Sequence, residues 1–84
     1  MAGDENVNML LSDAQLNKKC IIEKIDAPKE EKIRLYDLGF LPESSVMPMY
    51  VSFLDSTRAY MVKGALIALR KDCSDTIKVR LCDE

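Results

Sequence analysis

The chain has 84 residues, 48% of them hydrophobic and 31% charged, a balance typical of one soluble globular domain. Its 12 basic and 14 acidic residues give a formal net charge of −2, which disfavours nucleic-acid binding because phosphates require a clustered basic surface. The chain has no histidine, and this excludes histidine-based catalysis and zinc sites that mix cysteine with histidine.

The polar residues 1–8 are predicted to form a flexible tail, followed by a single domain over residues 9–84. The acidic N-terminus is unlike a secretory signal, and the longest apolar run, residues 46–54, is too short to span a bilayer as a helix. The cysteines form an odd set without a short-range pair, which favours a cytoplasmic protein with free thiols: Cys20, Cys73 and Cys82.

Residues 19–25 are predicted to form a strand, and a helix is expected to begin at Pro28, which suits a first helical position. Gly39 is expected to end this helix in the left-handed conformation, so that Phe40 folds back onto the helix. We expect four apolar residues of this corner to fill one end of the fold, although a partner-binding role for the corner stays open: Leu35, Leu38, Phe40 and Leu41.

The rest of the chain is predicted to be mainly strands, at residues 45–53, 58–62, 65–70 and 77–81, with a helical turn over residues 71–75. Pro48 lacks an N–H donor and should lie at an edge or a bulge, and Gly64 marks a tight turn or a bulge. The pattern indicates a mainly β fold, a small closed or nearly closed barrel of about five strands with one or two short helices.

The stretches "RLYDLGFLPESSV" and "KGALIALRKDCSDTIKV" resemble the ferrous iron transport protein A (FeoA) family, a small cytoplasmic domain with an SH3-like barrel. The resemblance covers residues 11–81, and its structural signature consists of Arg34, Leu35, Leu38, Gly39, Leu41, Pro42, Gly64, Ala68, Leu69 and Arg70. The chain departs from the family at Glu43, where glycine is common. A type I turn is therefore expected there rather than a type II turn.

The resemblance implies a non-enzymatic accessory or regulatory protein of bacterial ferrous iron uptake. Such a protein docks on the cytoplasmic part of the iron permease that carries a GTPase domain (FeoB), and it is peripheral to the membrane through that partner only. The resemblance leaves open whether the protein forms a homodimer. Related domains also occur in iron-dependent repressors.

No catalytic or cofactor-binding residue is assigned from the sequence. If Met47, Met49 and Phe53 point outward, they are expected to form an apolar docking patch; the alternative is that the methionines fill the core. A second hypothesis is a small sensor or carrier that binds Fe(II) or another transition metal itself, because the chain has cysteines, methionines and acidic residues. No ligand motif supports this second reading.

Overall fold

The computed structural model describes residues 9–52 and 56–82. The expected N-terminal tail at residues 1–8 and the predicted docking residue Phe53 lie outside these ranges. The elements, in chain order, are β1 (Met9–Leu10), the 3-10 helix η2 (Leu11–Asp13), β2 (Cys20–Ile25), α1 (Lys29–Leu38), β3 (Ser45–Ser52), β4 (Thr57–Val62), β5 (Ala65–Arg70), α2 (Lys71–Ser74) and β6 (Ile77–Leu81).

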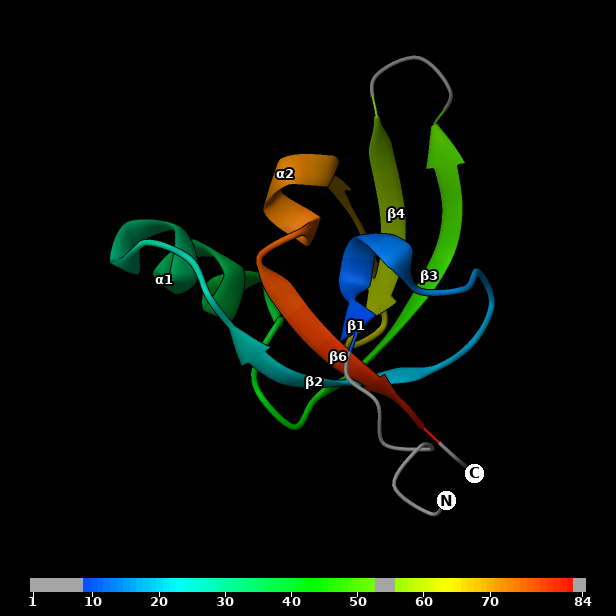
Figure 1. The fold of residues 1–84 in the computed structure, drawn as a ribbon, viewed down its shortest axis with the longest axis horizontal. Helices are drawn as coiled ribbons and strands as arrows, with labels where there is room; N and C mark the ends of the chain where they lie inside the picture. The colour runs from blue at the N-terminus through cyan, green and yellow to red at the C-terminus, as the bar shows by residue number, and fades with distance from the viewer. Residues whose placement is uncertain (1–8, 53–55, 83–84) are drawn as a thin grey trace.

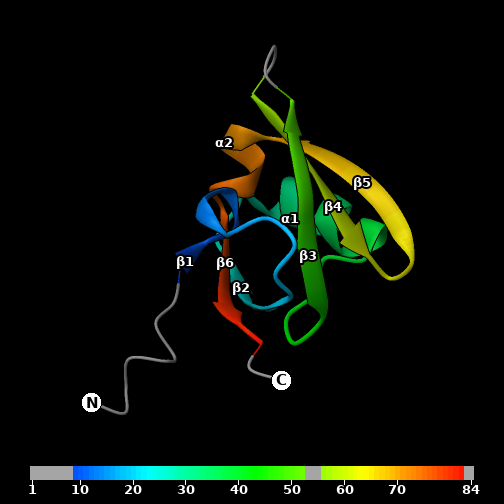
Figure 2. The same cartoon turned by 90° about the vertical axis from the view of Figure 1, so that its right-hand side faces the viewer.

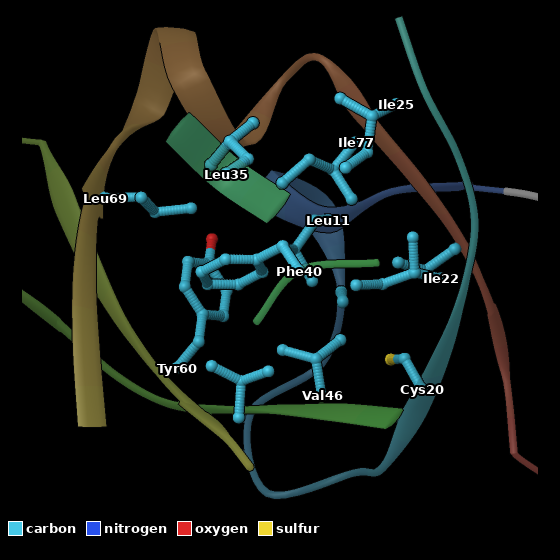
Figure 3. Packing of buried hydrophobic residues seen from close by; sticks show 13 residues of the cluster. Leu11, Cys20, Ile22, Ile25, Leu35, Phe40, Val46, Tyr60, Leu69 and Ile77 are labelled. Atoms are coloured by element: carbon cyan, nitrogen blue, oxygen red, sulfur yellow. The ribbon is translucent and has the colours of Figure 1, made fainter. Parts of the chain in front are cut away.

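The six strands form one antiparallel sheet in the order β1-β6-β2-β3-β4-β5 (Figure 1). The mainly β, SH3-like prediction is confirmed, but the closed barrel is not, because β1 and β5 end the sheet without pairing with each other. A side chain of helix α1 packs in the core on the side where the sheet stays open. Leu35 of α1 belongs to the same buried cluster as Leu69 of β5 and Ile77 of β6 (Figure 3).

The helix corner ends as the sequence predicts. Gly39 has a φ of 105°, and the N–H groups of Gly39 and Phe40 donate to the carbonyls of Tyr36 (3.0 Å) and Leu35 (2.9 Å). These two bonds are the Schellman pattern, and they bring Phe40 back over Leu35 in the core. Leu38 was wrongly expected in the core: it is the last residue of α1 and is 42% exposed.

The turn after the helix differs from the prediction. The Ser44 N–H donates to the Leu41 carbonyl at 3.0 Å, and Glu43 has a φ of 73°, which is the geometry of a type II turn rather than type I. Long-range contacts impose this conformation. The Glu43 N–H donates to the Ile22 carbonyl at 2.7 Å, and its carboxylate lies 3.8 Å from the Arg80 guanidinium.

A bulge and a hairpin turn set the register of β3, β4 and β5. The pairing of β3 with β4 shifts between Pro48 and Tyr50, so Pro48 lies at a bulge, as predicted. Lys63 and Gly64 have φ values of 51° and 80°, which are those of a two-residue type I′ hairpin turn. This turn pairs Val62 with Ala65 and thereby fixes every later pair of β4 and β5.

The core lies between the two halves of the curled sheet. Phe40 and Tyr60 meet edge to face with ring centroids 6.3 Å apart (Figure 3). The Tyr60 hydroxyl donates to the buried Ser74 Oγ at 2.7 Å. Burial of the Tyr60 ring raises the pKa of its hydroxyl. Among the described helices, none is long and apolar enough to cross a membrane.

Candidate docking surface

The side of the β3-β4-β5 sheet that faces away from the core is apolar. Residues directly opposite in an antiparallel pair share a face, so two rows run across the three strands. We call their six residues the outer face: Met47, Met61 and Leu66 in one row, and Tyr50, Ala59 and Ala68 in the other. The alternate row, which includes the fully buried Tyr60, faces the core.

The outer face is accessible to a partner. Tyr50 is 55% exposed, Leu66 48% and Met61 37%, whereas Met47 is half-buried. The six side chains include no carboxylate, ammonium or guanidinium group. An exposed apolar group of this kind, built on regular strands, is suited to binding another protein surface rather than to catalysis.

The sequence located only part of this surface. Met47 lies on the outer face, but Met49 is the extra residue of the bulge, has no opposite residue on β4 and is half-buried. Tyr50, Met61 and Leu66 were missed as docking residues. A signal for two of them was present, because a two-residue turn at Lys63-Gly64 necessarily places Met61 opposite Leu66.

The signature residues divide into structural and exposed ones. Leu35 and Leu69 are buried, Gly39 and Gly64 have positive φ, and Leu41 is half-buried. The remaining five are exposed: Arg34, Leu38, Pro42, Ala68 and Arg70. Three of them, Arg34, Ala68 and Arg70, line one groove, and Leu38 and Pro42 are not part of its lining.

Helix α1 also exposes apolar side chains. Leu35 is its only buried residue, and the helix stands at one side of the sheet (Figure 1). Ile33, Tyr36 and Leu38 are all exposed on it. This surface is the natural comparison for the outer face in any binding experiment.

A groove of about 320 Å³ lies between α1 and the end of β5, and it is lined by Glu31, Arg34, Ala68, Leu69, Arg70, Asp72 and Cys73. Burial and, after it, a hydrogen bond to the Glu31 carboxylate together raise the pKa of the Cys73 thiol to about 11. The groove therefore holds a protonated thiol at neutral pH, which is a poor nucleophile and a poor metal ligand.

Two other hollows are lined mainly by polar side chains, and one of them shares Arg70 and Asp72 with the groove. Their volumes are about 430 and 410 Å³. Hydrogen bonds from Ser12 and then Lys71 lower the pKa of Asp75, and Arg58 donates to three main-chain carbonyls. These groups already have partners within the chain.

The cysteines do not gather at one place. Cys20 is buried, and this burial raises the pKa of its thiol; Cys73 lies in the groove, and Cys82 follows β6. Within residues 9–52 and 56–82, no three cysteine or carboxylate side chains are close enough to hold a metal ion.

Comparison with known proteins gives consistent results. The family model described as the FeoA domain matches residues 9–81. An Fe(2+) transport protein A of Campylobacter jejuni is 30% identical over 73 residues, which cover 87% of this chain and 99% of that protein.

Two solved structures have the same fold. The solution structure of the FeoA protein from Chlorobium tepidum is 20% identical, with a TM-score of 0.83 over 89% of this chain and 71% of that one. A manganese-dependent transcriptional repressor is 13% identical, with a TM-score of 0.82 over 92% of this chain and 43% of that one.

Proposed function

Because the chain belongs to the FeoA domain family, a family of ferrous iron transport, we propose that it is a non-enzymatic accessory protein that docks on an iron permease. The partner is the cytoplasmic part of the permease that carries a GTPase domain, FeoB. The protein acts in the cytoplasm and reaches the membrane through this partner only.

The outer face is the observation that supports docking. Its exposed side chains, Tyr50, Met61 and Leu66, lie on three paired strands and need no ordering before they bind. Aromatic and methionine side chains are enriched in protein interfaces, and a rigid surface loses little conformational entropy on association.

The test measures binding of the purified protein to the cytoplasmic region of the permease by calorimetry, with and without guanine nucleotide. Met61→Asp and Leu66→Asp place a charge on the outer face, and each is expected to weaken binding about tenfold or more, because burying an unpaired carboxylate is costly.

The matched control is Ile33→Asp, which places the same charge on the exposed surface of α1. It is expected to leave binding unchanged. Absence of binding at high micromolar concentration in both nucleotide states contradicts the proposed function. Loss of binding in Ile33→Asp alone assigns docking to α1 and contradicts the role of the outer face. Thermal melts of each variant verify that the fold is intact.

A further inference from the structure

Strand β5 is an open edge of the sheet. It is the last strand in the sheet order and pairs only with β4 among the described strands (Figure 2). In a two-residue hairpin the residues that flank the turn exchange both hydrogen bonds, so Ala65, Ile67 and Leu69 direct their peptide groups toward β4. The peptide groups of Leu66, Ala68 and Arg70 consequently point outward, and Leu66 and Ala68 are exposed.

Helix α1 runs beside this edge. At its C-terminal end, a Cβ added to Gly39 would lie 3.3 Å from Lys63 Cγ, in the turn before β5. At its first turn, Glu31 lies near Cys73, in the helix after β5. The groove of about 320 Å³ lies between them, with residues 68–70 of β5 along one side. An extended chain placed here would have the open edge on one side and a helix on the other.

The groove has arginines without ion-pair partners. Arg34 and Arg70 are both exposed, and neither forms an ion pair within the part of the chain that the structure describes. Of the two acids that line the groove, Glu31 accepts the hydrogen bond of the Cys73 thiol, and Asp72 lies at the α2 end. Both guanidinium groups are therefore available to carboxylates from outside the chain.

We propose that the open edge of β5 takes up an extended acidic segment of the partner as an additional strand. Its peptide groups pair with those of Leu66, Ala68 and Arg70, and its carboxylates, on the opposite face of the added strand from its apolar residues, face Arg34 of α1. Apolar residues at alternate positions extend the outer face beside Leu66. The inference rests on the proposed function for the identity of the partner.

Charge argues against a second copy of this chain at the same edge. A symmetric antiparallel pair of β5 strands has its twofold axis near Ile67 or Ala68, so residues beside the axis meet their own copies. Arg34 lines the same groove as Ala68, so a second copy would bring another Arg34 toward this edge. An acidic segment removes this repulsion and supplies the missing counter-charge.

The probe is a capped peptide of alternating valine and glutamate, and its matched control replaces each glutamate by lysine. Amide signals of the ¹⁵N-labelled protein are followed by NMR during titration. We expect the acidic peptide to shift the amides of Leu66, Ala68 and Arg70, and the lysine peptide to leave them unshifted. The same titration is repeated with the cytoplasmic region of the permease.

Two pairs of variants separate strand pairing from charge. Ala68→Pro removes an outward N–H without disturbing the bonds to β4, whereas Ala68→Val keeps the N–H, so only the proline variant should weaken binding, by about tenfold. Arg34→Glu should weaken binding at least as much, whereas Lys24→Glu, an equal charge change at an exposed position of β2, should not. If Ala68→Pro fails to fold, the amide shifts and the comparison of Arg34→Glu with Lys24→Glu test the proposal.

The outcomes distinguish this inference from the proposed function. Binding of the peptide at the edge without binding of the permease region supports the edge inference and contradicts the proposed partner. Binding of the permease region with unshifted edge amides, or equal affinity for Ala68→Pro and Ala68→Val, overturns the edge inference alone. A dimer of the free protein that dissociates in Ala68→Pro assigns the edge to a second copy and also overturns it.

Discussion

Cys73 shows how one groove controls the chemistry of a single side chain. Burial and Glu31 raise its thiol pKa from 9.0 to about 11, so between these values the folded chain holds a proton that the unfolded chain has lost. The contribution of this thiol to the free energy of unfolding is therefore complete below pH 9 and is lost as the pH rises through 11. Alkylation by iodoacetamide at pH 8, measured for each cysteine by mass spectrometry, should be about 100-fold slower at Cys73 in the folded protein than in urea.

The cause of the shift can be tested with a pair of neighbouring acids. Glu31→Gln removes the carboxylate that accepts the thiol hydrogen bond and should accelerate alkylation of folded Cys73. Glu30→Gln removes an exposed carboxylate one residue earlier and should have no effect. Equal alkylation rates of Cys73 in folded and urea-unfolded protein at pH 8 would contradict a raised thiol pKa in the folded chain.

Glu43 is a residue whose backbone conformation is unfavourable for its type. Its φ of 73° costs a residue with a Cβ about 1–2 kcal/mol relative to glycine. Its ion pair with Arg80, at 3.8 Å and with the Glu43 side chain 75% exposed, contributes little. Glu43→Gly should therefore raise the free energy of unfolding by about 0.5–1 kcal/mol, after allowance for the greater entropy of unfolded glycine, as measured by urea denaturation. A loss of stability would show that the ion pair outweighs the strain.

At the level of elements, the two glycines with positive φ form a natural comparison. Gly39→Ala and Gly64→Ala both place a Cβ at a left-handed position, at a cost of about 1 kcal/mol or more. The added Cβ at Gly39 also meets Lys63 Cγ at 3.3 Å, whereas at Gly64 it meets no atom within 4 Å. Thermal unfolding should therefore show a larger loss for Gly39→Ala. Equal losses would mean that the Lys63 side chain moves away at no cost.

Elements governed by local chemistry were predictable from the sequence. The strands Ala65–Arg70 and Ile77–Leu81 have the predicted bounds, and Gly39 ends the helix through bonds within its own last turn. The turn at Glu43 was predicted wrongly because its conformation depends on the hydrogen bond to the Ile22 carbonyl, which is distant in the sequence. A turn propensity contains no information about such contacts.

At the level of the whole molecule, the sequence predicted the SH3-like fold but only part of the candidate site. The outer face depends on the register among three strands, and the bulge at Pro48 changes which residues of β3 share a face with β4. For that reason Tyr50 lies on the outer face and Met49 does not oppose a residue of β4. The open edge of β5 could not be predicted either, because the sequence does not show which strand β1 pairs with. In the structure β1 pairs with β6, and β5 is left at the end of the sheet.

Arg58 connects the two halves of the molecule. Its Nη1 donates to the carbonyls of Leu11 (2.9 Å) and Ser12 (2.8 Å), and its Nη2 to that of Ala14 (2.8 Å), so β4 holds the N-terminal 3-10 helix against the core. Arg58→Met keeps an apolar stem of similar length but leaves three carbonyls without their charged donor. The free energy of unfolding should fall by about 2–4 kcal/mol.

The loss should be largest at the N-terminal segment. Hydrogen exchange should accelerate more at the Ala14 amide, which donates to Leu11 O at 3.1 Å, than at amides within β4 and β5. Arg58→Lys should lie between wild type and Arg58→Met, because one ammonium lacks the planar fork that reaches three acceptors. Arg70→Met, on the neighbouring strand and without such bonds, should change stability by less than about 0.5 kcal/mol. Arg58→Met with wild-type stability and exchange would mean that β1 and the 3-10 helix are held by the burial of Leu11 and Ala14 alone.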